Sequence, residues 1–265
     1  MNLSDTGFYI FDIRNFFDDV FVTNTVDFFS TRREFYRKRL RELTNDRGSD
    51  AHFNFVKDME SKIGKDYSYL YNDNPIGFKF DYKFMMDCFE YFDDINIEEL
   101  VDVTERITRL SLLGFMVDFN DVPLNKLIDK INFKILSTLT GENITNHSFS
   151  TIHKHLNVYP KKSFMSAHED NDPNRKYTII NFLNTGRKLK DGSLTRFFLP
   201  TYKFDGVFVR DFYEQSMAID ILPDYRTVIV FDHTKNNDIV GQLTHLVTKN
   251  KSNDIRFSVY NTYMY

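Results

Sequence analysis

A histidine and several carboxylates interrupt two apolar, strand-like runs in the segment "SFMSAHEDNDPNRKYTIINFLN", residues 163–184. Within it, His168 and Asp170 are two residues apart, a spacing that places both on the same side of a strand or of its mouth. An imidazole and a carboxylate at this spacing can bind a metal ion, but the same pair is also typical of a polar loop at the end of a strand. The pair alone leaves both interpretations open.

Further residues with matching chemistry lie near the other end of the chain. His245 lies on a strand-like run, Arg256 follows it after eleven residues, and Ser258 is two residues further on. In a hairpin of that length His245 and Arg256 can lie on neighbouring strands, with Ser258 on the face of Arg256. Two imidazoles and one carboxylate on one face of Fe(II) form the facial triad of non-haem oxygenases. An arginine beside a hydroxyl can hold the carboxylate of a co-substrate.

Three other histidines compete for a place in this site. His233 directly follows "IVFD" and is an alternative to His245, but no arginine follows it at the matching distance. A surface histidine at a strand end explains His233 equally well, so we prefer His245. His153 and His155 share one face of a strand-like run, where they either line the site or are partly exposed.

Composition limits the class of protein. The chain has 265 residues, 42% of them hydrophobic, with 28 Phe, 15 Tyr and no Trp, which predicts a folded protein with an aromatic core. The net charge of −4 gives no general attraction to nucleic acid or anionic membranes. The single cysteine, Cys88, excludes an internal disulfide and a cysteine-based zinc cluster. With no signal-peptide pattern at the N-terminus and no apolar run of about 18 residues, we expect a soluble, cytoplasmic protein.

The first half of the sequence is mainly helical. The capping-box spacing of Thr31 and Glu34 predicts the start of an amphipathic helix within "STRREFYRKRLREL". Its basic face, residues 32–41, could contact phosphates, but a solvated helix surface is the commoner explanation. Further helices are predicted at 83–93, 97–114 and 124–139, an early strand at "GFYIFDI", and loops at 45–50 and 71–77.

From about residue 150 the hydrophobic period changes to two. Short strands are predicted at 151–159, 176–184, 193–200, 205–211, 217–222, 226–232, 244–249 and 255–263. Many short strands after a helical half indicate an α+β protein, a sandwich or barrel with helices packed against one sheet. No linker separates the halves, so we expect a single domain, 1–265, with 1–150 as mainly helical support and 150–265 as the core.

The order of these residues resembles the iron(II)- and 2-oxoglutarate-dependent dioxygenase superfamily. The matching elements are "HED" (168–170), His245 and "RFS" (256–258), and "NVYPKKSFMSAHEDNDPN" is similar to the corresponding stretch of prolyl hydroxylases. "YTIINFLN" and "DGSLTRFF" resemble the two strands that follow the first metal ligands. The resemblance covers about 150–265 and implies a double-stranded β-helix, or jelly roll, with supporting N-terminal helices.

The resemblance also implies a site and an activity. His168, Asp170 and His245 would be metal ligands for Fe(II), and Arg256 and Ser258, helped by Tyr159 and Tyr177, would hold 2-oxoglutarate. O2 is the oxidant, and ascorbate is a further candidate cofactor. The implied reaction of this oxidoreductase is hydroxylation of an aliphatic carbon with release of succinate and CO2. The implied substrate is a small molecule or a peptide, either a free amino acid or a prolyl residue.

Other functions of the same scaffold stay open. A nucleic-acid base oxidase or dealkylase of the same superfamily would use the basic helix, although the β-rich half has no strong basic patch. A non-catalytic jelly-roll binding module would take up no iron and turn over no 2-oxoglutarate. A metal-dependent hydrolase would leave Arg256 and Ser258 without a role. The carboxylate at Asp170 occupies the position that related halogenases leave open for chloride, which favours hydroxylation.

Overall fold

The computed structural model describes residues 7–40, 44–47, 50–71, 78–91, 115–118, 121–168, 170, 173–199, 217–235 and 245–265. The helix predicted at 97–114 and the strand predicted at 205–211 lie outside these residues. Within the described part of the chain, no helix is long and apolar enough to cross a membrane.

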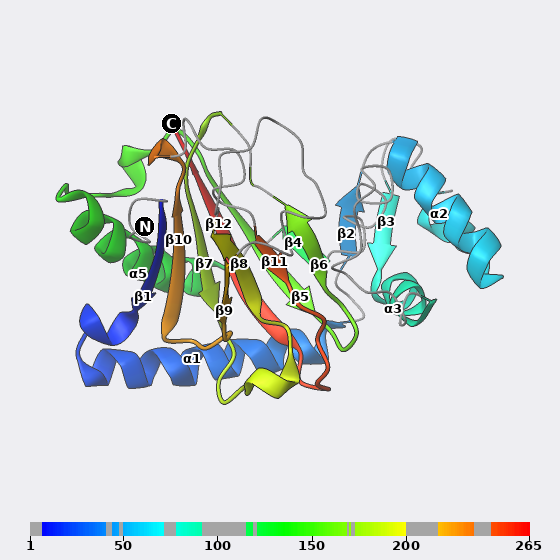
Figure 1. Ribbon diagram of the computed structural model, residues 1–265, viewed down its shortest axis with the longest axis horizontal. Helices are drawn as coiled ribbons and strands as arrows, with labels where there is room; N and C mark the ends of the chain where they lie inside the picture. Colours follow the sequence, from blue (N-terminus) through cyan, green and yellow to red (C-terminus); the bar gives the residue numbers. More distant parts are fainter. Residues whose placement is uncertain are drawn as a thin grey trace.

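The larger of two facing sheets has six antiparallel strands (Figure 1). In spatial order they are β1 (Phe8–Asp12), β10 (Thr227–Asp232), β7 (Arg175–Phe182), β12 (Arg256–Met264), β5 (Ile152–Tyr159) and β4 (Phe115–Asp118). The early strand predicted at "GFYIFDI" is therefore confirmed as β1, at one edge of the sheet.

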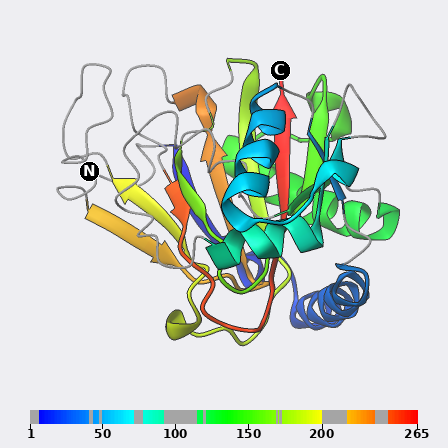
Figure 2. The same ribbon diagram turned by 90° about the vertical axis from the view of Figure 1, so that its right-hand side faces the viewer.

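The smaller sheet has four strands and lies across the larger one (Figures 1 and 2). Its order is β6 (Met165–His168), β11 (His245–Val247), β8 (Thr195–Leu199) and β9 (Met217–Ile221). From β5 onward the chain passes repeatedly between the two sheets, so that β5, β7, β10 and β12 belong to one and β6, β8, β9 and β11 to the other. This eight-stranded winding is a jelly roll. The predicted α+β class with a double-stranded β-helix is confirmed.

Helices cover the outer face of the larger sheet. α1 (Asp19–Lys38) runs along one end of the strands, and α5 (Val122–Thr140) crosses behind them (Figure 1). α5 matches the helix predicted at 124–139. It begins at Asp121, whose carboxylate accepts a hydrogen bond from the Leu124 amide at 3.1 Å, and ends at Gly141 with φ of 74°.

α1 begins at Asp19, well before the cap predicted at Thr31. Asp18 is its N-cap and accepts a hydrogen bond from the Phe21 amide at 2.8 Å. Thr31, predicted as a cap, lies inside the helix, where its hydroxyl donates to the carbonyl of Asp27 at 2.9 Å. The aromatic and β-branched first half has weak helix propensity, but burial overrides it. The buried positions are Val22, Thr25, Phe29 and Tyr36.

A smaller unit lies beside the barrel, at the right of Figure 1. It contains β2 (Thr44–Arg47), β3 (Phe78–Asp81), α2 (Asp50–Ile63) and α3 (Tyr82–Tyr91). α3 matches the helix predicted at 83–93, whereas β2 lies where a loop was predicted, because it pairs with β3. Short 3-10 helices are η2 (Ile13–Asn15), η4 (Ser68–Leu70), η6 (Asn146–Ser148), η7 (Leu189–Asp191) and η8 (His233–Lys235).

The two faces of β12 have different partners. Phe257, Val259 and Tyr263 belong to the apolar core between the larger sheet and the helices. The alternate residues face the smaller sheet, since Arg256 bonds to residues at the start of β8 and Tyr260 packs on the core between the sheets. That second core includes Phe8 and Phe197, whose rings stack at 3.8 Å. The chemically interesting residues of β12 therefore lie between the sheets.

Candidate active site

The two histidines predicted as metal ligands are brought together by strand pairing. His168 ends β6, His245 begins β11, and they are direct partners in the antiparallel register. Residues in direct register occupy neighbouring positions across a strand pair. His245 is 2% exposed, and its ring lies 4.8 Å from the ring of Phe231. The side chain of His168 lies outside the described part of the structure.

Asp170 is held by two groups of the larger sheet. Its Oδ2 accepts a hydrogen bond from the Tyr260 hydroxyl at 2.5 Å, and its Oδ1 lies 3.3 Å from Nη1 of Arg175. Arg175 also donates to the Tyr260 hydroxyl at 2.9 Å. Burial, together with the charge of Asp170, holds the pKa of Tyr260 well above its usual value, so Tyr260 stays a protonated donor. The orientation of the Asp170 carboxylate is therefore defined by its neighbours.

The structure separates the competing histidines. His233 begins η8, and its Nε2 lies 2.9 Å from the hydroxyl of Thr178 on β7. Thr178 is two residues from Ile180, the register partner of Tyr260, so His233 contacts the strand that lies beside Tyr260. On β5, His153 is exposed, and His155 is half-buried and in register with Tyr260.

Arg256 crosses from one sheet to the other. Its side chain is 1% exposed, with Nη1 donating to the carbonyl of Ser193 at 2.8 Å and Nη2 to the hydroxyl of Thr195 at 3.1 Å. The guanidinium carbon lies 4.9 Å from the ring centroid of Tyr159 and 5.0 Å from that of Phe182. Two of the five N–H donors of an arginine are thus used, and Nε has no partner.

Arg256 has no counter-ion among the residues that the structure describes. No carboxylate of those residues forms an ion pair with it, although desolvation makes a buried cation costly. Burial lowers the pKa of Arg256 to about 10, the titratable phenol group of Tyr159 opposes this shift, and the nearby charge of Arg187 adds to it. A pKa of about 10 still leaves the guanidinium charged near neutral pH. The site therefore presents a positive charge that an anion could neutralise.

Unsatisfied polar atoms lie next to this cation. Ser258, on the same face of β12, has a buried hydroxyl with no hydrogen-bond partner. Asn157 is in register with Ser258, and its side-chain oxygen is also buried without a partner, as is the hydroxyl of Ser193. Such atoms normally have partners, and an ordered water or a polar ligand between the sheets would supply them. A carboxylate accepting from Arg256 and Ser258 would fit this set.

Of the two predicted tyrosines, the structure places one at the cation. Tyr159 is fully buried, in register with Arg256, and burial raises its pKa to about 12. Tyr177 lies on the other face of β7, where its ring contacts Phe149 in the core under the helices. The structure therefore does not bring Tyr177 to Arg256. Adjacent residues of a strand point to opposite faces, and the sequence of β7 does not show which face points toward the site.

Several residues of the site were not identified from the sequence. Asn157 and Tyr260 lie two residues from the predicted Tyr159 and Ser258 on their strands, so strict alternation could have found them. Thr195 begins β8, where no site residue was predicted. Arg175 is the first residue of β7 and Arg187 lies five residues after its last residue, and no sequence signal indicates their partners.

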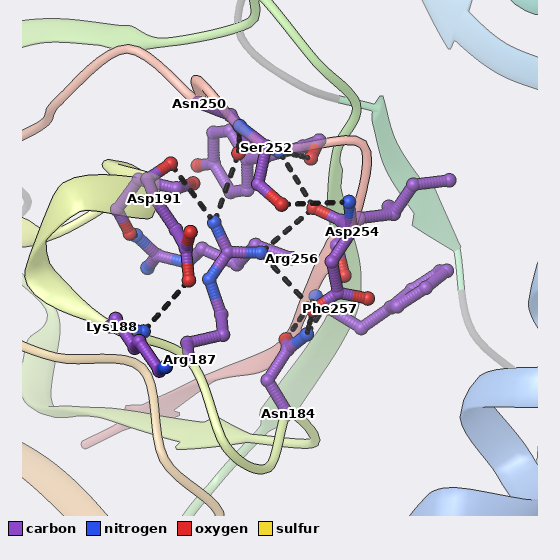
Figure 3. A network of polar contacts seen from close by, with 12 residues as sticks. Asn184, Arg187, Lys188, Asp191, Asn250, Ser252, Asp254, Arg256 and Phe257 are labelled. Carbon is purple, nitrogen blue, oxygen red and sulfur yellow. Dashed lines mark hydrogen bonds and ion pairs between the residues drawn. The ribbon is translucent and has the colours of Figure 1, made fainter.

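Arg187 is a second buried arginine close to Arg256, but its partners are complete except at Nε. Its Nη1 donates to the carbonyl of Asp254 at 2.8 Å and lies 3.3 Å from its carboxylate, and its Nη2 donates to Asn250 at 2.9 Å. Figure 3 shows this arginine surrounded by its partners. The contrast identifies Arg187 as a paired, structural cation and Arg256 as the one lacking a counter-ion.

A metal centre is compatible with the residues but is not complete among the described side chains. Those side chains contain no group of three His, Cys, Asp or Glu residues that could hold a metal ion. The predicted set needs His168, of which only the backbone position is described. The described part places residue 168 opposite His245 and gives Asp170 an oriented carboxylate.

Comparisons with known proteins concern the fold. No protein-family model and no curated protein matches the sequence. Solved structures do match. One is a prolyl-4-hydroxylase from Pseudomonas putida, with 19% identity over 54% of this chain and 64% of that chain and a TM-score of 0.36.

Two further solved structures give similar values. A prolyl hydroxylase from Trichoplax adhaerens, in complex with a hypoxia inducible factor peptide, has 15% identity over 53% of this chain and 54% of that chain, with a TM-score of 0.36. An oxidoreductase of the 2OG-Fe(II) oxygenase family from Burkholderia pseudomallei has 20% identity over 54% of this chain and 55% of that chain, with a TM-score of 0.37. The similarity is one of fold. It spans about half of this chain and less than two thirds of each of these three proteins.

Proposed function

We propose that this protein is an iron(II)- and 2-oxoglutarate-dependent hydroxylase. The observation that carries the proposal is Arg256, a buried cation with unused donors and no counter-ion among the described residues, beside the unsatisfied hydroxyl of Ser258. A buried arginine of this kind suits a carboxylate ligand. Fully paired arginines such as Arg187 do not require one.

The proposed metal ligands are His168, Asp170 and His245. Two imidazoles and one carboxylate suit Fe(II) and leave positions open for other ligands. The Tyr260 hydroxyl and Arg175 would orient the Asp170 carboxylate, as outer-shell groups do in metal sites. Phe231, packed on the His245 ring, would keep water from that side.

The proposed co-substrate site lies at Arg256, Ser258 and Tyr159. Arg256 and Ser258 would donate to the distal carboxylate of 2-oxoglutarate, and the Tyr159 ring under the guanidinium would limit where that carboxylate lies. We add Asn157 to this group and leave out Tyr177, which lies on the far face of β7. When bound, iron and 2-oxoglutarate would supply O2-dependent hydroxylation of an aliphatic carbon, with release of succinate and CO2.

The substrate and setting are proposals of the same kind. A prolyl residue of a peptide or a free amino acid remains the expected substrate, with ascorbate as a candidate reductant. We treat 1–265 as one domain in which the N-terminal helices support the barrel. A reducing, cytoplasmic setting is expected because the single cysteine, Cys88, is buried and unpaired by disulfide.

Two measurements test the proposed function. Anaerobic calorimetry should detect 2-oxoglutarate binding that needs both Mn(II) and an intact Arg256, so that Arg256→Met abolishes it. With Fe(II) and O2, a screen of amino acids and proline-containing peptides should detect a gain of one oxygen atom and substrate-dependent succinate. Both should be lost in His168→Ala and Asp170→Ala. Full activity in those variants, or no metal-dependent 2-oxoglutarate binding by the wild-type protein, would overturn the proposal.

A further inference from the structure

The two buried arginines share one short loop. Arg187 Nη2 lies 3.4 Å from the carbonyls of both Asp191 and Gly192, and Arg256 Nη1 donates to the next carbonyl, that of Ser193, at 2.8 Å. Three consecutive carbonyls are thus bound by two guanidinium groups. The position of the Ser193 carbonyl, and with it that of Arg256, depends on how Arg187 holds this loop.

Arg187 also reaches the other side of Arg256. Its partner Asn250 uses its own amide to donate to the carbonyl of Tyr159 at 2.8 Å and to that of Asp254 at 3.0 Å. Tyr159 carries the ring that lies under the Arg256 guanidinium. Figure 3 shows Asn250 and Asp254 around Arg187, on the turn that leads into β12. Tyr159 is therefore one hydrogen bond away from Asn250, a partner of Arg187, and Ser193 directly follows Gly192, whose carbonyl also binds Arg187.

The loop has little room to adjust. Gly192 has φ of +66°, and a Cβ built there would lie 2.1 Å from the carbonyl oxygen of Lys249. Hydrogen bonds run from the Ser193 amide to Lys249 at 3.2 Å and from the Lys251 amide to Asp191 at 2.9 Å. Because this loop is packed so closely, a shift of the carbonyls that Arg187 binds should also move the Ser193 carbonyl.

We propose that Arg187 is a positioning residue of the co-substrate site. By holding the Ser193 carbonyl and Tyr159 against Arg256, it sets the affinity of the site for the distal carboxylate of 2-oxoglutarate. This inference rests on the proposed function. Asp254 forms an ion pair with Arg187, and we assign Arg187 a geometric role, which a variant that keeps its charge can test. Arg187 itself touches no ligand.

The test distinguishes binding of the distal carboxylate of 2-oxoglutarate from chelation of the metal by its other end. Arg187→Lys keeps the charge but cannot span Asp254, Asn250 and the loop carbonyls together. Anaerobic calorimetry with Mn(II) compares 2-oxoglutarate with oxalate, which chelates the metal but has no distal carboxylate. We expect Arg187→Lys to weaken 2-oxoglutarate binding by roughly tenfold or more and to leave oxalate binding unchanged. A tenfold change corresponds to the loss of one charge-assisted hydrogen bond, here between the displaced Arg256 and the distal carboxylate. Arg226→Lys, at a half-buried arginine paired with Asp224, is the matched control and should change neither.

A second variant covers the case in which Arg187→Lys does not fold. Asn250→Asp has the same size, but its carboxylate cannot donate to the carbonyls of Tyr159 and Asp254, and the same selective loss is expected. Unchanged 2-oxoglutarate affinity in the folded variants, or an equal loss for both ligands, overturns the inference and leaves the proposed function standing. Absence of 2-oxoglutarate binding by the wild-type protein with Mn(II) instead overturns the proposed function and the inference together.

Discussion

Arg256 and Arg187 are two buried arginines with opposite consequences for stability. Arg187 has a carboxylate partner, Asp254, that is partly exposed. Removing the Arg187 side chain takes one hydrogen bond from Asn250 and one from each of three carbonyls. Arg256 is buried without a counter-ion among the described residues, so part of its interaction energy already offsets its own desolvation. Groups that destabilise the free protein are common where a ligand will bind.

This contrast gives the first prediction. Arg187→Met should lower the free energy of unfolding by roughly 3 kcal/mol, because it removes the ion pair with Asp254 and several buried hydrogen bonds. Arg256→Met should lower it by clearly less, or raise it, while abolishing 2-oxoglutarate binding. Urea unfolding of the ligand-free proteins measures both changes. An equal or larger loss at Arg256 would mean that its role is structural.

The second prediction concerns Tyr260. Tyr260→Phe removes the donor to Asp170 at 2.5 Å, so the carboxylate loses an orienting group. Mn(II) affinity should fall by roughly tenfold, the lower end of the effect of outer-shell changes. Anaerobic metal titration measures it.

Tyr263→Phe is the matched control for Tyr260→Phe. Tyr263 is also buried on β12, but its hydroxyl accepts a hydrogen bond from Asn132 of α5, on the opposite face of the sheet. Its replacement should reduce stability and leave metal affinity unchanged. If both variants bind metal like the wild-type protein, Asp170 does not depend on Tyr260.

At the scale of elements, one carboxylate joins the two long helices. Asp121 caps α5, accepts a hydrogen bond from the Tyr36 hydroxyl at 2.8 Å, and lies 3.4 Å from Nε of Arg32 on α1. The arginine that sequence analysis placed on a basic helix face is therefore partly used inside the molecule. That use weakens the case for α1 as a phosphate-binding surface.

The third prediction follows from this junction. Asp121→Ala removes a cap and leaves the buried Tyr36 hydroxyl without its acceptor, so the free energy of unfolding should fall by roughly 2–3 kcal/mol. Asp18→Ala, which removes only the cap of α1, should cost about 1 kcal/mol. Chemical denaturation of the two variants compares them. Equal losses would show that the contacts to α1 add nothing.

Strands and helices could be predicted from the sequence where their hydrophobic residues followed one clear period. The alternation in "KYTIINFLN" and "IRFSVYNTY" identified β7 and β12, and the helical spacing of residues 124–139 identified α5. The first half of α1 was missed because its residues favour strands and only burial makes them helical. β2 was missed because pairing with β3, far along the chain, creates it.

The same reasoning explains what was found at the site. His168, His245 and Arg256 have side chains whose chemistry is distinctive, and the two histidines do lie on neighbouring strands. The prediction that His245 and Arg256 lie on neighbouring strands of a hairpin was wrong, because β11 belongs to the smaller sheet and β12 to the larger one. Arg187 was missed because its partners are largely backbone carbonyls and an amide on distant turns. Tyr177 was grouped with Arg256, but it lies on the other face of β7, because alternation along a strand does not show which face points toward the site.

At the scale of the whole molecule, the single cysteine can serve as a probe of the unit beside the barrel, which contains α2 and α3. Cys88 of α3 is fully buried among Phe55, Phe84 and other members of the core, and burial raises the pKa of its thiol. Only the thiolate reacts readily with disulfide reagents.

The fourth prediction uses this thiol. Native protein should react with a disulfide reagent far more slowly than unfolded protein, at a rate set by opening of the unit that contains α2 and α3. Comparing that rate with amide exchange in β12 shows whether the unit opens on its own. Rapid labelling of the native protein would contradict the burial of Cys88.

The register of the larger sheet joins parts of the chain that are far apart. Phe8 lies opposite Phe231, and Tyr159 lies opposite Arg256. Pairings of this kind must lose chain entropy before they gain contacts, which makes all-β barrels fold in milliseconds to seconds, whereas helices form in about a microsecond or less. Refolding should therefore pass through species in which α1 and α5 exist before the barrel closes, with unpaired strand edges that invite aggregation. Because Arg256 is the first residue of β12 and bonds across to the other sheet, the guanidinium becomes enclosed only in the late, slow step that completes the barrel.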